Sequence, residues 1–246
     1  MSSDCLNCSA PVTQNYCANC GQKSSTHRYS IKHFIAHDFV HGIWHVDKGI
    51  LFTLKALFTR PGHSVREFIQ GKRVPYFSFV TLILLILTAS SLIAPYTHGS
   101  MTDLMPQASK AMMGEIEKFI SDHPKLILII TIPIYSFFTF IWFRKAKLNY
   151  SEHLVLNSNR IIVELIIGLL FSVITIFYTN SKVLVLYFGA VTLFAFIYSI
   201  WFYYQFFSGF NYSKKGLLLR SILVPASYYM VSFLIGVVSA IINLKH

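Results

Sequence analysis

The segment YFSFVTLILLILTASSLIAPY, residues 76–96, decides the fold class of this chain. It contains no charged side chain and consists almost entirely of apolar or hydroxyl-bearing residues. An α-helix needs about 20 such residues to cross a hydrocarbon core of about 30 Å, and this segment has that length. It therefore predicts a transmembrane helix.

Four more apolar runs of similar length follow. They span residues 126–143, 161–179, 183–207 and 217–244. Only 13% of the chain is charged, and its mean hydropathy is +0.54. A soluble domain carries about 25% charged residues, so water cannot be the solvent for most of this surface. The sequence predicts an all-α membrane protein, with a bundle of about five transmembrane helices in residues 74–246.

The distribution of Lys and Arg predicts the orientation, because cytoplasmic segments of membrane proteins carry more of both residues. With the N-terminus inside, the cytoplasmic segments hold Lys23, Arg28, Lys32, Lys48, Lys55, Arg60, Arg66, Lys72, Arg73, Arg144, Lys145, Lys147, Arg160, Lys214 and Lys215. The opposite side holds Lys110, Lys118, Lys125, Lys182 and Lys245. Fifteen of the 21 basic residues are then cytoplasmic and five are outside, with Arg220 at the inner edge of the fifth run. We therefore expect a cytoplasmic N-terminus, and this asymmetry accounts for the net charge of +11 without nucleic acid as a partner.

All four cysteines lie in the first 20 residues, as Cys5-Leu-Asn-Cys8 and Cys17-Ala-Asn-Cys20. Each C-x-x-C pair makes a tight turn that aims two thiolates at one point, and four thiolates complete a tetrahedral zinc site. Gly21 suits the left-handed turn that often follows such a pair. We predict a zinc ribbon in residues 1–25. Iron on the same thiolates stays open, whereas a reducing cytoplasm disfavours two disulfides, and no thioredoxin-like unit accompanies the pairs.

The zinc is expected to be structural, since four protein thiolates leave no coordination position for water or substrate. A head of this size cannot bury a core of its own, so the metal would supply its folding energy. Ribbons of this kind usually dock on another molecule. The head has too few basic residues to favour RNA, so the expected partners are the lipid bilayer and a protein, either a different one or a second copy of this chain.

Residues 26–73 form a juxtamembrane segment that contains four histidines in steps of four: His33, His37, His41 and His45. On a helix this spacing places the four side chains along one face. The apolar residues between them predict an amphipathic helix at the inner membrane interface. Three interpretations of the stripe stay open: it shapes an interfacial helix, adjacent pairs bind a metal, or the imidazoles titrate together near pH 6.

Two turn motifs close this segment. Pro61-Gly62 is expected to break one helix, and Gly71 is expected to end the next. Lys72 and Arg73 would anchor the first span at anionic headgroups. Far along the chain, the aromatic run of residues 202–207 predicts a belt at a membrane interface.

A carboxylate inside an apolar run points to the bundle interior or to a water path. Glu164 lies four residues after Arg160 in the third run, which predicts an ion pair on one helix face. Glu152 and His153 precede it on the expected cytoplasmic loop. If the histidine stripe folds against this loop, Glu152, His153 and Glu164 form a candidate catalytic cluster with the four histidines.

Three stretches of the chain resemble one bacterial family. They are CLNC with YCANCGQK at residues 5–8 and 16–23, the stretch from Asp47 through TRPGHSVREFIQGKRVPYFSF, and NYSEHLVL at residues 149–156. Together they resemble domain of unknown function 3667, whose members are zinc-ribbon multi-pass membrane proteins. The resemblance implies a bacterial inner (cytoplasmic) membrane and no established activity. Members often carry histidine shortly after the last stretch, where this chain has Asn157 and Asn159, which weakens a metal centre built on that loop.

Two functions follow from these observations. The first is a membrane scaffold or accessory subunit whose cytoplasmic ribbon docks a protein partner. The alternative is a membrane-embedded, metal-dependent enzyme that acts on lipid through a His/Glu/Asp cluster at the inner leaflet, with Asp38 and Asp47 as oxygen ligands beside the histidine stripe. A transporter has less support, because five spans give no even inverted repeat.

Overall fold

The computed structural model describes residues 3–26, 29–30, 49–97, 122–178 and 180–243. Within them, five helices are long and apolar enough to cross a membrane: Phe79–Tyr96, Lys125–Trp142, Tyr150–Phe177, Lys182–Phe207 and Lys214–Ile235. This confirms the predicted all-α membrane class and the number of spans. The predicted histidine helix falls on residues 31–48 and lies outside the described residues.

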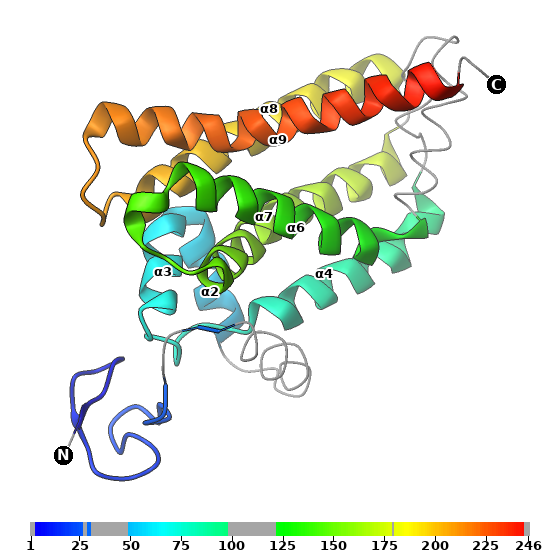
Figure 1. Cartoon of the computed structure of the whole chain (residues 1–246). Coiled ribbons are helices and arrows are strands. Elements are labelled where there is room, and N and C mark those ends of the chain that lie inside the picture. The colour runs from blue at the N-terminus through cyan, green and yellow to red at the C-terminus, as the bar shows by residue number, and fades with distance from the viewer. Residues whose placement is uncertain (1–2, 27–28, 31–48, 98–121, 179, 244–246) are drawn as a thin grey trace.

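The five spanning helices lie alongside one another in a single bundle (Figure 1). They are α4 (Phe79–Ile93, extended by the 3-10 turn η2, Ala94–Tyr96), α6 (Pro124–Trp142), α7 (Tyr150–Phe177), α8 (Ser181–Phe207) and α9 (Lys214–Asn243). Helix α7 packs against α4 and α6, and α9 packs against α8 and α6. Side-chain oxygens of Ser78, Asn149 and Asn180 accept hydrogen bonds from backbone N–H groups in the first turns of α4, α7 and α8. These N-caps pair N–H groups that have no partner within the helix.

Helix α7 begins earlier than its apolar run. It starts at Tyr150, after the short 3-10 turn η4 (Arg144–Ala146), so the expected loop before Ile161 is helical over most of its length. Most of its first eleven residues are polar, and nine of the eleven are buried. A run of apolar residues identifies the part of a helix that faces lipid. The first turns of α7 face other helices, so their polar residues gave no such run and the helix start was not predicted.

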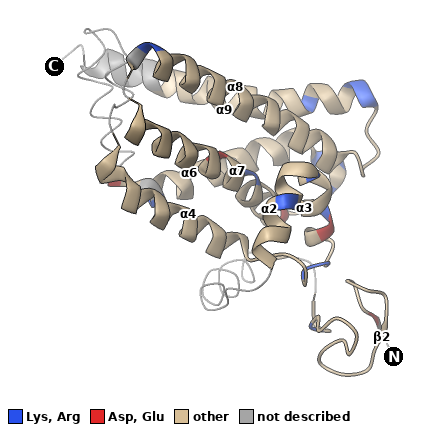
Figure 2. Ribbon diagram, turned by 180° about the vertical axis from the view of Figure 1, so that it is seen from behind, with Lys and Arg blue, Asp and Glu red and all other residues tan. Residues whose placement is uncertain are grey.

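Two short helices lie across one end of the bundle, beside the start of α7 (Figure 1). Helix α2 spans Gly49–Thr59 and α3 spans Pro61–Ile69, so the chain breaks at Pro61-Gly62 as expected. Gly71, with φ +111°, ends α3, also as expected. Most of the Lys and Arg residues in the described part of the chain lie at this end of the bundle (Figure 2).

Helix α3 packs against the last turns of α8. The Nη1 atom of Arg66 donates to the carbonyl oxygens of Gln205 and Phe206, at 3.1 and 2.8 Å. These are among the carbonyl groups that a helix end leaves unpaired, so Arg66 caps α8 from a neighbouring element. Burial, followed by the positive charges of Arg66 and Arg60, lowers the pKa of His63, and its neutral Nδ1 accepts from Nη2 of Arg66 at 2.8 Å.

The expected aromatic belt at residues 202–207 is instead part of the core. Phe202, Tyr203, Phe206 and Phe207 are fully buried. Phe207 stacks on Phe143, with ring centroids 3.6 Å apart. Aromatic residues near the end of a span usually face the interface, but here α3 covers this part of α8 and removes it from the lipid.

The cysteine-containing head lies outside the bundle, near the end that carries α2 and α3 (Figure 1). Its strand β1 (Ser3–Asp4) pairs antiparallel with β2 (Pro11–Val12). Only a few apolar side chains pack within it, and its buried hydrophobic cluster consists of Cys5, Val12 and Cys17. The head therefore has too little apolar core to hold its shape without a cross-link or a metal.

Candidate metal centre

The four cysteines converge on one point. The Sγ atoms of Cys5 and Cys20 are 3.6 Å apart, as are those of Cys8 and Cys17. All four sulfur atoms lie within 4.8 Å of one another. A tetrahedron with metal–sulfur bonds of about 2.3 Å has edges of about 3.8 Å, whereas a disulfide needs about 2.05 Å. The cluster therefore fits a four-thiolate metal site, and the cysteines are not disulfide-bonded.

The two C-x-x-C turns have the same backbone design. In the first, the N–H of Cys5 donates to the carbonyl of Ala10, and in the second the N–H of Cys17 donates to Gln22. Each turn then needs a left-handed residue: Gly21 has φ 75°, and Ser9 has φ 58°. Gly21 was expected in this role, whereas Ser9 was not, because serine rarely adopts positive φ.

The turns favour the charged form of one of the four thiols, Cys8, whereas, despite the N–H of Gln22, burial and the neighbouring Cys8 and Cys5 thiols raise the pKa of Cys20 to about 11. The backbone N–H of Ala10, followed by the side chain of Asn19, lowers the pKa of Cys8 to about 6. A thiolate at neutral pH is the form that coordinates a metal ion. The donor set is four soft thiolates, which suits zinc or iron and leaves no open coordination position.

The candidate catalytic residues within the described part of the chain, Glu152, His153 and Glu164, lie on α7 and interact with protein groups. Glu152 accepts the N–H of Asn149 at 2.8 Å in a capping box that begins the helix. Glu164 pairs with Arg160, as the spacing predicts. Among the described residues, only the four cysteines form a group of three or more side chains able to hold a metal. His33, His37, His41 and His45 lie outside the described residues, so a cluster that includes them stays a prediction.

His153 is buried in a polar network between helices. Its Nδ1 lies 2.9 Å from Oγ1 of Thr139 on α6. Asn157, one turn later, donates to the same Oγ1 at 3.1 Å and accepts from the hydroxyl of Tyr203 on α8 at 2.6 Å. Polar side chains that bond across helices stabilise membrane bundles, and this network joins α6, α7 and α8.

The sequence did not point to the small polar residues of α6 and α8 that bond to α7. Ser136 and Thr139 lie three residues apart on α6, which puts both on the face toward α7. On α8, Ser199 accepts a hydrogen bond from Arg160 at 2.9 Å. A search for small polar residues at helical spacing within the apolar runs could have found them.

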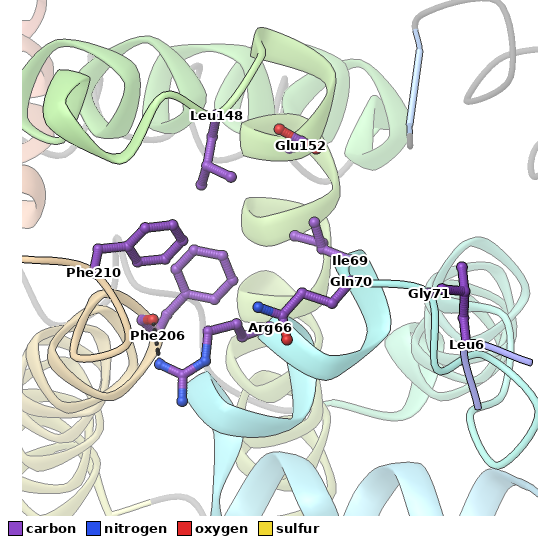
Figure 3. Close-up of a pocket in the computed structure, with 9 residues that line it drawn as sticks. All are labelled: Leu6, Arg66, Ile69, Gln70, Gly71, Leu148, Glu152, Phe206 and Phe210. Atoms are coloured by element: carbon purple, nitrogen blue, oxygen red, sulfur yellow. Dashed lines mark hydrogen bonds between the residues drawn. The ribbon is translucent and has the colours of Figure 1, made fainter. Parts of the chain in front are cut away.

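A cavity of about 270 Å³ lies where the head meets the bundle (Figure 3). Its lining residues are Leu6, Arg66, Ile69, Gln70, Gly71, Leu148, Glu152, Phe206 and Phe210. Figure 3 shows Arg66 bonded to Phe206 on one side of the cavity and Leu6 beside Gly71 on the other. Glu152 is thus the one candidate catalytic residue of the described part that lines this cavity.

The comparisons with known proteins give one match. Residues 47–90 match the family model described as "Protein of unknown function (DUF3667)". No curated protein and no solved structure matches the chain. The matched segment comprises the chain from just before α2 to near the end of α4, which includes the α3 helix that caps α8. The resemblance to the DUF3667 family that the sequence motifs predicted is thereby confirmed, and the chain shares its α2–α4 segment with that family.

Proposed function

We propose that this chain is a membrane scaffold or accessory subunit whose zinc ribbon docks a protein partner at the cytoplasmic face of a bacterial inner membrane. The observation that carries this proposal is the closed four-thiolate cluster on a head outside the bundle. A site with four protein ligands stabilises a fold and performs no chemistry on a substrate. The head also exposes an aromatic side chain, Tyr16, that is 59% accessible, and exposed tyrosine is a common anchor of protein interfaces.

The metal is the first element to test. We expect one zinc per chain in wild-type protein purified without chelator and none in Cys17→Ser, because the cluster would lose one of its four ligands. Membrane insertion should be unchanged, since the spans do not depend on the head. Metal analysis of both purified proteins gives the result. Wild type without metal would remove the ribbon from the proposal, and metal retained by Cys17→Ser would support the alternative enzyme with a second centre at the histidine stripe.

The same two proteins test docking. Cross-linking in intact cells should join a defined partner to wild type and not to Cys17→Ser, because the ribbon would be unfolded in the variant. Gln14→Ala, at an exposed position of the head, is the matched control and should cross-link as wild type does. Equal cross-linking of wild type and Cys17→Ser to the same protein would show that the partner does not recognise the ribbon.

The proposed orientation has its own test. The basic residues cluster at the end of the bundle that carries α2, α3 and the head, which supports a cytoplasmic location for that end (Figure 2). Reporter fusions at His98 and Lys147 are expected to report opposite sides, with Lys147 cytoplasmic. Fusions that report the same side would contradict the order of the spans along the chain.

A further inference from the structure

Among the described residues, each of the two cysteine turns contributes one residue that contacts the end of α3. In the first turn, Leu6 lies between the ligands Cys5 and Cys8 and packs on Gly71. A Cβ atom added to Gly71 would lie 2.6 Å from Cδ1 of Leu6, so a larger residue would have to displace the Leu6 side chain, and the φ of +111° favours glycine at this position. In the second turn, Oε1 of Gln22 accepts the backbone N–H of Arg73 at 3.2 Å.

Gln22 links the metal site to this contact within a single residue. Its carbonyl oxygen accepts the N–H of Cys17 at 2.8 Å and so helps to form the second turn. Its side chain is 4% exposed and reaches the bundle at Arg73. The position of this side chain therefore depends on the turn that the metal holds in place.

The bundle side of the contact is the C-terminal end of α3. Gln70 and Lys72 donate their N–H groups to the carbonyls of Arg66 and Glu67, at 2.9 and 3.0 Å, which closes the helix end. Both contact residues, Gly71 and Arg73, lie inside the segment that matches the family model. The same helix end lines the cavity, and Leu6 forms the wall of the cavity on the side of the head (Figure 3).

We propose that metal binding at the ribbon controls the end of α3: the loaded ribbon holds Leu6 and Gln22 against Gly71 and Arg73, and loss of the metal releases them. The head has almost no apolar core, so metal loss unfolds it and removes both contacts together. The cavity then loses the wall that Leu6 provides, while the α3–α8 contacts at Arg66 persist. This inference rests on the metal site of the proposed function and does not depend on the protein partner.

The backbone N–H of Arg73 reports on this contact directly. It is expected to exchange with deuterium roughly fivefold faster once zinc is removed from the full-length protein, because one net hydrogen bond is lost. Exchange measured by mass spectrometry on peptides that cover residues 70–76 gives the rate. Peptides that cover residues 5–22 show in the same sample that the ribbon has unfolded.

A variant avoids the need for a chelator. Zinc-loaded Gln22→Ala keeps all four cysteines and should retain one metal, yet Arg73 should exchange as fast as in zinc-free wild type. Gln14→Ala, an exposed glutamine of the same head, is the matched control and should exchange as zinc-loaded wild type does. The inference would be overturned if exchange at residues 70–76 is unchanged in zinc-free wild type whose ribbon has unfolded. It would also be overturned if exchange there is unchanged in Gln22→Ala. Either result would leave the zinc site intact. Absence of metal from wild type would instead overturn the zinc site itself.

Discussion

Replacing Glu164 with alanine is expected to destabilise the folded bundle by roughly 3 to 5 kcal/mol, the cost of removing one partner from an ion pair that is buried except for the 25% exposure of the Glu164 side chain. Arg160 is fully buried, and its Nη1 donates to Glu164 and, at 2.9 Å, to Ser199. The guanidinium also lies over the ring of Tyr135, 3.8 Å from its centroid. Without Glu164 the positive charge would remain at membrane depth with no counter-ion, which is the costly arrangement.

The measurement is thermal unfolding of the purified protein in detergent. The expected cost corresponds to a fall in Tm of roughly 10 °C for a chain of this size. Arg60→Ala is the control, because it breaks an exposed ion pair. The side chain of Arg60 is 45% exposed and that of its partner Glu67 is 30% exposed. Exposed pairs contribute at most about 1 kcal/mol, so that variant should melt close to wild type.

A double variant separates the ion pair from the space it fills. Arg160→Met with Glu164→Leu removes both charges and keeps similar volume, so it should recover most of the stability that Glu164→Ala loses. If Glu164→Ala melts within a degree of Arg60→Ala, the pair is not a structural element of the bundle. Glu164 would then return to consideration as a functional carboxylate.

The parts of the fold that the sequence predicted are those with a local physical signal. Each span is long enough to meet the length requirement of a bilayer by itself, and each C-x-x-C pair fixes two thiolates within a few residues. The break at Pro61-Gly62 and the helix end at Gly71 likewise follow from the backbone limits of proline and glycine. None of these features needs knowledge of what packs against them.

The parts that were missed depend on contacts between distant segments. The segment that holds His153 and Asn157 was expected to be a loop because the apolar run begins only at Ile161. Their partners, Thr139 and Tyr203, lie on other helices, and only the folded bundle brings these groups together. The aromatic end of α8 was assigned to the interface for the same reason, since nothing near it in sequence shows that α3 covers it.

The contact between α3 and α8 yields the second large effect. Gly62, in the first turn of α3, lies so close to α8 that an added Cβ would overlap the backbone atoms Phe206 N and Phe202 O. It would also lie 2.6 Å from Cβ of Gln205. Two of these three atoms belong to the backbone of α8, so no side-chain rotation can relieve the overlap, and the helices would have to separate.

Gly62→Ala is therefore expected to cost roughly 1 to 3 kcal/mol, the usual range for overpacking a close contact. Separation would also weaken the bond from the Gly62 N–H to Oε1 of Gln205, now 3.2 Å long, and the cap that Arg66 places on α8. Gly168→Ala is the matched control, because Gly168 is helical and a Cβ there meets nothing within 4 Å. Alanine stabilises a helix relative to glycine by up to about 1 kcal/mol, so the two identical substitutions should shift Tm in opposite directions. If the Gly62→Ala protein melts at or above the wild-type temperature, α3 does not pack on α8 through this glycine. The Arg66 cap would then need a separate test with Arg66→Ala.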